Sequence, residues 1–208
     1  MNSLKKFDTE FLSRKIKLIA GVDEAGRGPI AGPVVAAAVI FDKKTFNDRI
    51  NDSKKLAEET REELYTWIVA NCISYGVGIV DHEEIDRINI LQASLKAMKI
   101  AVSGLEPEPH LCLIDGNKSF ISEIPTRTIV KGDSKSISIA AASIIAKVTR
   151  DRIMNNYAKK YPGYRWDRNK GYATKAHINA VKKLGATRLH RQTFLSRILE
   201  QEKQEVLF

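Results

Sequence analysis

The sequence predicts an α/β fold in which helices flank a mixed β-sheet, with a small helical extension at the C-terminal end. Short apolar segments follow one another early in the chain, whereas later ones alternate with amphipathic segments typical of helices. The 208 residues, of which 43% are hydrophobic, suffice for one domain with a substantial core. We therefore expect a single domain over residues 1–208, in which about residues 160–208 form a loop and helices in a small lobe.

Three strands are expected in the first half of the chain. Two are continuous apolar runs, and the third alternates between apolar and polar positions as a half-buried strand does. They lie at residues 16–23, 33–41 and 73–80. Asp52 and Ser53 are placed to cap a helix that continues to about Cys72.

The second half of the chain alternates between strands and helices. Apolar residues recur at helical spacing from Leu91 to Leu105, and Ser134 or Ser136 is placed to begin another helix. Two short strands, at residues 111–114 and 128–130, precede that second helix. A polar loop then leads to two short helices, near 174–184 and 190–202.

Three of the expected strands end in or lead into acidic side chains: Asp23 and Glu24, then Asp115, then Asp133. Strand ends form the edge at which α/β proteins usually build their crevices. Like charges gathered there repel one another unless cations neutralise them, and ligands that offer only oxygen favour Mg²⁺ or Mn²⁺ over Zn²⁺. A pair of such ions can activate water for phosphodiester cleavage. A single aspartate could equally be a turn residue or a helix cap, but three sites with the same pattern favour a metal site.

A glycine-rich turn comes directly after the first acidic pair. The spacing of Gly26, Gly28 and Gly32 differs by one residue from the dinucleotide-binding fingerprint. The turn also leads into an expected strand at Pro33 rather than into a helix, which excludes a nicotinamide or flavin cofactor. The turn around Arg27 could bring its backbone close to a sugar or phosphate, although a tight hairpin would need the same glycines.

The charge balance suits a polyanionic partner. Lys and Arg number 34 against 25 Asp and Glu, for a net charge of +9, and neutralising phosphates releases condensed counterions. Basic residues near the acidic strand ends include Lys54, which we expect to contact substrate. Others in the same regions are Lys55, Lys131, Lys135, Lys147, Arg150 and Arg152. The loop 161–172 mixes aromatic and basic residues, and there Tyr161 and Trp166 are expected to pin the loop to the domain.

The remaining polar residue types suggest no further chemistry. The cysteines, Cys72 and Cys112, form no metal-binding pattern and are expected to be buried and reduced. The four histidines show no ligand spacing and are expected on the surface or on helices. The N-terminal segment contains no apolar stretch typical of a secretory signal, so we expect a cytoplasmic protein without membrane spans.

Several motifs, occurring in order over about residues 16–195, resemble those of bacterial ribonuclease HII. They are DEAGRGPIAGPV (23–34), DSKKL (52–56), INILQASL (88–95), KGDSKSISIAAASIIAKVTRDR (131–152), YPGY (161–164) and KGYAT (170–174). The resemblance implies a ribonuclease H-like fold and dependence on Mg²⁺ or Mn²⁺. It also implies cleavage of RNA in RNA–DNA hybrids or at single ribonucleotides in duplex DNA.

The resemblance also implies roles for individual residues. The metal-binding and catalytic carboxylates would be Asp23, Glu24, Asp115 and Asp133, of which Asp133 could act directly or by positioning water. The turn that reads the ribose 2′-hydroxyl would be Gly26, Arg27 and Gly28, and Tyr172 would sense the junction between RNA and DNA. Many relatives have histidine where this chain has Asn169, a change that affects only the fine contacts of the loop.

We expect incision on the 5′ side of a ribonucleotide by a two-ion mechanism, which leaves 3′-hydroxyl and 5′-phosphate ends. Two other functions are compatible with parts of the pattern. A non-catalytic nucleic-acid-binding module would not need clustered acids, and a small-molecule phosphohydrolase would not need the basic, aromatic loop. The chain is expected to act as a monomer. The segment Gln204–Phe208 resembles peptides that bind the sliding clamp, but it could equally be a frayed terminus or part of a tag.

Overall fold

A five-stranded mixed sheet forms the centre of the molecule in the computed structural model, which describes residues 3–196 and residue 198. The strands are β1 Ile19–Ala25, β2 Val34–Ile40, β3 Ser74–Val80, β4 Leu111–Asp115 and β5 Thr126–Ile129. Their order is β3-β2-β1-β4-β5, with β1 antiparallel to β2 and parallel to β4. The predicted α/β class is confirmed, and β1 occupies the centre of the sheet.

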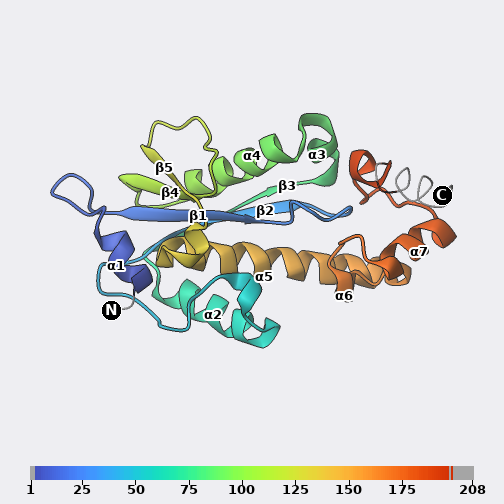
Figure 1. The fold of residues 1–208 in the computed structure, drawn as a ribbon, viewed down its shortest axis with the longest axis horizontal. Helices are drawn as coiled ribbons and strands as arrows, with labels where there is room; N and C mark the ends of the chain where they lie inside the picture. The colour runs from blue at the N-terminus through green and yellow to red at the C-terminus, as the bar shows by residue number, and fades with distance from the viewer. Residues whose placement is uncertain (1–2, 197, 199–208) are drawn as a thin grey trace.

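Helices cover both faces of this sheet (Figure 1). On one face lie α3 His82–Ile88 and α4 Ile90–Ser103, and on the other α2 Glu58–Asn71 and α5 Ile137–Lys160. Strand β2 is buried at every position because it is covered on both sides, which explains its continuous apolar sequence. The short helix α1, Ser3–Thr9, packs beside α5.

The N-terminal end of α5 approaches β1 very closely. A Cβ atom placed on Gly21 would lie 2.1 Å from the carbonyl carbon of Ser138, so only glycine allows this approach. The side chain of Ser136 caps the helix by accepting a hydrogen bond from the Ile139 N–H at 3.2 Å. The first turn of α5 is thereby held against the strand that carries Asp23.

Several predicted boundaries differ from the structure. Asp52 caps only the short 3₁₀ turn Ser53–Lys55, and α2 begins later, at Glu58, without a side-chain cap. The segment before α4 forms the separate helix α3, because Asn89 adopts φ 68° and interrupts the helical backbone. Strand β1 begins at Ile19 and continues to Ala25, so it starts three residues later than expected and extends two residues beyond Asp23.

The C-terminal elements form a hydrophobic cluster with the end of α5. They are the 3₁₀ turn Pro162–Tyr164, α6 Trp166–Asn169 and α7 Lys175–Leu184. Trp166 is fully buried in this cluster, as expected for a residue that pins the loop. Of the last predicted helix, 190–202, residues 192–196 and 198 are helical, and the rest lies outside the described residues.

Two expectations about buried polar residues need correction or refinement. His177 lies on helix α7, as one of the two expectations had it, but both His177 and His190 are almost fully buried, and their Nε2 atoms lie 3.2 Å apart in the C-terminal cluster. Cys112 is buried and Cys72 half-buried, and both are free thiols. No helix within the described part of the chain is long and apolar enough to cross a bilayer.

Candidate active site

Strand β1 brings two acidic side chains to the middle of the sheet. Its parallel pairing with β4 matches Val22 to Ile114, so Asp23 and Asp115 occupy the next positions on adjacent strands. Successive side chains of a strand point to opposite faces. Asp23 therefore projects toward the α5 face, on which Gly21 contacts Ser138, whereas Glu24 projects toward the α4 face.

The other two acids are linked through the segment that precedes α5. One carboxylate oxygen of Asp115 accepts a hydrogen bond from the backbone N–H of Gly132 at 2.6 Å. Asp133 follows directly in the 3₁₀ turn Gly132–Ser134, and it is buried. Lys131, with φ 56°, turns the chain into this position. Asp133 thus lies on a turn three residues beyond the predicted strand 128–130, which the structure places at Thr126–Ile129, and the Gly132 N–H beside it is bonded to Asp115.

The four carboxylates are close enough to affect one another's ionisation. Burial, followed by the charges of Glu24, Asp115 and Asp133, raises the pKa of Asp23 well above its usual value. Burial also raises the pKa of Glu24, against the opposing charge of Arg27, and burial and Asp115 raise the pKa of Asp133. The predicted convergence of these side chains is therefore present in the structure, and a nearby cation would stabilise the ionised cluster.

The carboxylate oxygens suit a hard cation, but in this structure they are not arranged as a complete coordination site. Within residues 3–196 and 198, no three His, Cys, Asp or Glu side chains are arranged as a ready metal site. Two of the acids instead accept backbone hydrogen bonds, Asp23 from Glu24 N–H at 2.7 Å and Asp115 from Gly132 N–H. All the nearby donors are carboxylate oxygens, which suit Mg²⁺ or Mn²⁺.

Lys54 is the cation on the solvent side of this cluster. Burial acts to lower its pKa, but the charges of Asp23, Asp133, Asp52 and Asp115 outweigh that effect and raise it. Its position is fixed by the turn Ser53–Lys55, in which Asp52 accepts a hydrogen bond from the Lys54 backbone. An ammonium group here can meet a phosphate that approaches the acids.

The glycine turn begins where β1 ends. The guanidinium of Arg27 pairs with Glu24 at 3.2 Å while its side chain remains half exposed. Gly26 has φ 99° and a Cβ there would meet Arg150, so this position requires glycine. The turn therefore lies directly beside the acidic cluster, with Arg27 connecting the two.

Tyr172 reaches the turn from the C-terminal part of the chain. A Cβ on Gly28 would lie 3.6 Å from Cε1 of the Tyr172 ring, so ring and turn are in contact. The ring is 44% exposed and can also meet a ligand. The side chain of Asn169 donates to Tyr164 O at 2.8 Å and accepts from the Gly171 N–H at 2.9 Å. Asn169 thus shapes the loop that carries Tyr172.

Some basic residues near the acids are not available to phosphates. Arg150 is buried and bonded to backbone carbonyls, Lys147 pairs with Asp151 at 2.7 Å, and Lys170 donates to Asn155. Arg150 and Lys170 are buried, and the ammonium group of Lys147 is held by Asp151 one helical turn away. The sequence pattern does not separate these three residues from exposed basic residues, because it does not show which side chains already have partners.

Other residues close to the site were not singled out from the sequence. Ser94 on α4 is buried, and its hydroxyl has no hydrogen-bond partner within the part of the chain that the structure describes. It lines a small pocket of about 60 Å³ together with Glu24 and Asp115. The motif 88–95 already contained Ser94, but only the tertiary structure shows which of its residues faces the acids.

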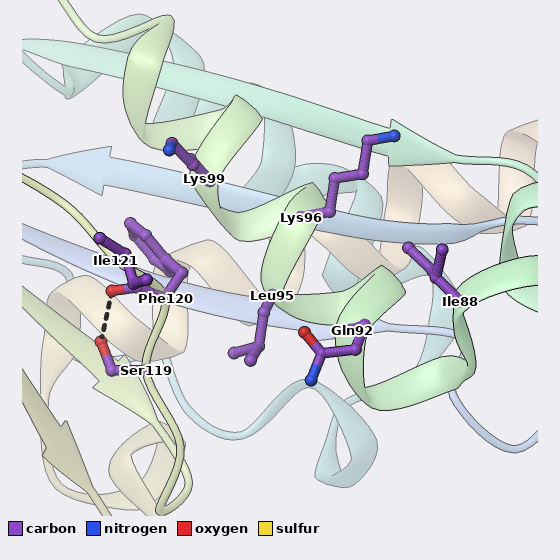
Figure 2. A pocket seen from close by; sticks show the side chains of 8 residues that line it. All are labelled: Ile88, Gln92, Leu95, Lys96, Lys99, Ser119, Phe120 and Ile121. Atoms are coloured by element: carbon purple, nitrogen blue, oxygen red, sulfur yellow. Dashed lines mark hydrogen bonds between the residues drawn. The ribbon is translucent and has the colours of Figure 1, made fainter.

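An open groove of about 570 Å³ adjoins this pocket on the α4 side. Figure 2 shows Leu95 and Lys99 of α4 on one side of the groove, and Phe120 and Ile121 from the loop after β4 on the other. Leu95 lines both the groove and the small acidic pocket. The groove is thus continuous with the surface around Asp115.

Comparison with known proteins identifies the class to which this fold and site belong. The profile of the family described as ribonuclease HII matches residues 20–197. A ribonuclease HII from Acetivibrio thermocellus is 55% identical over 188 residues, which cover 90% of this chain and 73% of the relative. The chain is therefore a nuclease, and it belongs to the ribonuclease HII family.

Solved structures share the same fold. The ribonuclease H2 of Pyrococcus horikoshii OT3 superposes with a TM-score of 0.73 at 28% identity, covering 88% of this chain and 98% of that one. The RNase HII in a complex with PCNA from Archaeoglobus fulgidus superposes with a TM-score of 0.68 at 27% identity, covering 84% and 94%. The predicted ribonuclease H-like fold is confirmed.

Proposed function

We propose that this ribonuclease cleaves the RNA strand of RNA–DNA hybrids and incises duplex DNA on the 5′ side of an embedded ribonucleotide. The products would carry 5′-phosphate and 3′-hydroxyl ends. The observation that carries this proposal is that two structural features with different chemistry meet at the end of β1. An acidic cluster suited to phosphodiester hydrolysis adjoins a backbone turn that a sugar can approach closely. Only the 2′-hydroxyl separates RNA from DNA at a single nucleotide.

The carboxylates Asp23, Glu24, Asp115 and Asp133 would hold two Mg²⁺ or Mn²⁺ ions. Such ions supply an activated water and neutralise charge on the leaving oxygen. The chain's own residues would then fix the substrate relative to the acids. Asp133 lies on a turn outside the strands, and the charge of Lys54 lowers its pKa. It would either bind a metal ion directly or orient the attacking water.

Substrate selection would belong to the turn and its neighbours. The backbone of Gly26, Arg27 and Gly28 would meet the ribose, because the exposed Gly28 carries no side chain to keep a sugar away. Tyr172, in contact with Gly28, would pack against the adjoining deoxyribose. Lys54 would bind a phosphate beside the acids. Ribose selection and hydrolysis would thus use separate residues of one surface.

One assay series tests this proposal. Three labelled duplexes of the same sequence, all-DNA, DNA with one ribonucleotide and a full RNA–DNA hybrid, are incubated with and without Mg²⁺ or Mn²⁺. We expect metal-dependent cleavage of the last two, and end analysis should find a 5′-phosphate on the ribonucleotide. Cleavage of the all-DNA duplex would refute 2′-hydroxyl selection, and cleavage in EDTA would refute the metal site.

The Asp115→Asn variant provides the matched control. It removes one negative charge while its remaining oxygen can still accept the Gly132 hydrogen bond. We expect turnover to be almost abolished while the circular dichroism spectrum and the binding of duplex remain. Full activity of this variant would contradict the assignment of Asp115 to the catalytic cluster.

We propose three further properties of this protein. The C-terminal elements from about residue 160 would act as a small lobe of a single domain, since they share a hydrophobic cluster with α5. The protein would be a cytoplasmic monomer. The segment Gln204–Phe208, which lies outside the described residues, would bind a sliding clamp, and the Archaeoglobus relative is described in complex with PCNA. Unchanged clamp affinity after removal of residues 204–208 would refute that last proposal.

A further inference from the structure

Two arginines are buried behind the glycine turn without an acidic partner. Arg150 and Arg191 are 1% and 0% exposed, and neither pairs with a carboxylate among the described residues. Burying an unpaired guanidinium is costly unless its donors are satisfied. Both side chains meet that requirement with backbone carbonyl oxygens alone. These arginines therefore fix the positions of the backbone carbonyl groups to which they donate.

Arg191 holds the turn itself. Its Nη2 donates to the carbonyl of Gly26 at 2.7 Å and its Nη1 to that of Arg27 at 3.1 Å. Its Nε donates to the carbonyl of Gly32 at 2.9 Å, on the returning side of the loop. A guanidinium presents these donors in one rigid plane, so the three carbonyls are fixed relative to one another.

Fixing those carbonyls also fixes the amide groups that follow them. The peptide bonds after Gly26 and Arg27 are trans, and in a trans peptide the C=O and N–H bonds point in opposite directions. Because the two carbonyls point inward to Arg191, the N–H groups of Arg27 and Gly28 point away from it. Neither N–H donates to any acceptor in the part of the chain described by the structure. Both are therefore available to an oxygen of a ligand.

Arg150 connects the same loop to the segment that carries Tyr172. It donates to Ala31 O at 3.2 Å, to Pro33 O at 2.9 Å and to Lys170 O at 2.9 Å. Two residues after Lys170 comes the ring that contacts the turn. Arg191 thus binds the backbone of the glycine turn, and Arg150 binds the backbone of the segment that carries Tyr172.

We propose that Arg191, with Arg150 beside it, is a positioning residue for ribose recognition that directs the Arg27 and Gly28 N–H groups toward the 2′-hydroxyl oxygen. This inference rests on the proposed function, in which the turn reads the ribose. It assigns to the C-terminal segment, 165 residues away from Gly26, a direct part in substrate selection.

The test measures binding selectivity, which a purely structural role would not alter. Dissociation constants for a duplex with one ribonucleotide and for the same all-DNA duplex are measured by fluorescence anisotropy in EDTA, where no cleavage occurs. The variant is Arg191→Lys, which keeps the charge but cannot span three carbonyls. We expect the wild-type preference for the ribonucleotide to fall by roughly tenfold, the effect of losing one or two hydrogen bonds.

Two control variants separate positioning from stability and from charge. Arg188→Lys makes the same substitution at an exposed position nearby, and Val181→Ala removes buried volume from the C-terminal cluster without contacting the turn. Both should keep the preference, even if Val181→Ala lowers the melting temperature as much as Arg191→Lys does. Loss of the preference in Val181→Ala would overturn the inference, because general loosening would then explain the result.

The outcomes distinguish the inference from the proposed function. If the wild-type protein shows no preference for the ribonucleotide, the proposed function of the turn fails. If the wild-type protein shows the preference and Arg191→Lys retains it, only the positioning role fails. Should Arg191→Lys not fold, ¹⁵N NMR of the wild-type protein decides. The Arg27 and Gly28 amide signals must shift with the ribonucleotide duplex more than with all-DNA, and equal shifts would overturn the inference.

Discussion

The ring of Tyr172 lies against Gly28, with Cε1 at 3.6 Å from the place that a Cβ on that glycine would take. This is an ordinary van der Waals distance, so the position has room for a methyl group. Gly26, two residues earlier, differs in its backbone conformation and in the space available for a methyl group. Its φ is 99°, and a Cβ there would lie 2.1 Å from Nε of the buried Arg150. The two glycines of one turn thus meet different physical requirements.

Alanine substitutions should separate these requirements. We expect Gly26→Ala to lower the free energy of unfolding by about 1–3 kcal/mol from backbone strain, with an added cost for displacing Arg150. Gly28→Ala should change it by about 0.5 kcal/mol or less, yet weaken selection of the ribonucleotide because the methyl group narrows the surface beside Tyr172. Urea denaturation and the cleavage ratio between ribonucleotide-containing and hybrid duplexes measure the two effects.

Gly185 provides the control for strain alone. It has φ 83°, but a Cβ there would meet no atom within 4 Å. Gly185→Ala should therefore show only the strain component, and Gly26→Ala should be the more destabilising of the two. Equal losses of stability would mean that the contact with Arg150 contributes nothing.

Neutralising one member of the acidic cluster should stabilise the metal-free protein. Asp23 is buried near three other carboxylates, so Asp23→Asn removes repulsion while its amide oxygen can still accept the Glu24 hydrogen bond. We expect a rise in Tm of about 2–4 °C in EDTA, equivalent to roughly 1 kcal/mol for a domain of this size. The further rise that Mg²⁺ or Mn²⁺ gives the wild-type protein should be lost.

The exposed Asp48 serves as the comparison for that experiment. Asp48→Asn makes the same chemical change outside the cluster, so its Tm should stay near that of the wild type with and without metal. A metal-induced rise that persists in Asp23→Asn would contradict the placement of Asp23 among the metal ligands.

The acidic side of the site could be anticipated from the sequence because its signal is local. Asp115 is the last residue of the short strand β4, Asp133 comes four residues after β5, and strand ends converge at one edge of a sheet. The same pattern indicated Asp23, which lies two residues before the end of β1. Local sequence thus identified the acids, while the sheet register determined which face each one occupies.

The buried residues that support the glycine turn and Tyr172 could not be predicted from the sequence, because only tertiary contacts bring them to the site. Arg191 reads locally as one basic residue near a helix, but its partners Gly26 and Gly32 precede it by 165 and 159 residues. His177 likewise reads as a helix residue, although it is buried and bonded to Trp166. No spacing rule relates such positions, so only the folded chain shows that they meet.

Lys54 should affect metal and nucleic acid in opposite directions. Its charge interacts with Asp23, Asp133 and Asp115, and the same charge is placed to attract phosphate. Lys54→Met should therefore bind Mg²⁺ or Mn²⁺ more tightly, while its affinity for duplex falls and the salt dependence of that affinity decreases by about one phosphate contact. Isothermal titration with metal, and anisotropy at several salt concentrations, measure the two effects.

Lys55→Met is the neighbouring comparison, since Lys55 is exposed and is not among the groups that shift the pKa of Asp23 or of Asp133. It should leave metal affinity unchanged. If Lys54→Met weakens both metal and duplex binding, the variant has disturbed the site as a whole and the opposing roles are refuted.

The buried histidine pair holds the backbone of Tyr172. Trp166 Nε1 can only donate, so His177 Nε2 accepts its bond at 2.9 Å, and His177 Nδ1 then donates to Tyr172 O at 2.9 Å. The Thr187 N–H donates to His190 Nδ1 at 2.9 Å, and His190 Nε2 lies 3.2 Å from His177 Nε2. This arrangement requires both rings to be neutral.

Acid should therefore weaken the fold through this pair. Burial, followed by the charge of His177, lowers the pKa of His190 from 6.5 to about 4. Between these values the unfolded chain binds a proton that the folded chain does not, so the free energy of unfolding falls as pH drops from 6.5 toward 4. Above pH 6.5 the pair contributes no pH dependence. His190→Gln, which cannot be protonated, should show a smaller fall in urea stability between pH 7 and pH 5, and an unchanged fall would show that another group titrates.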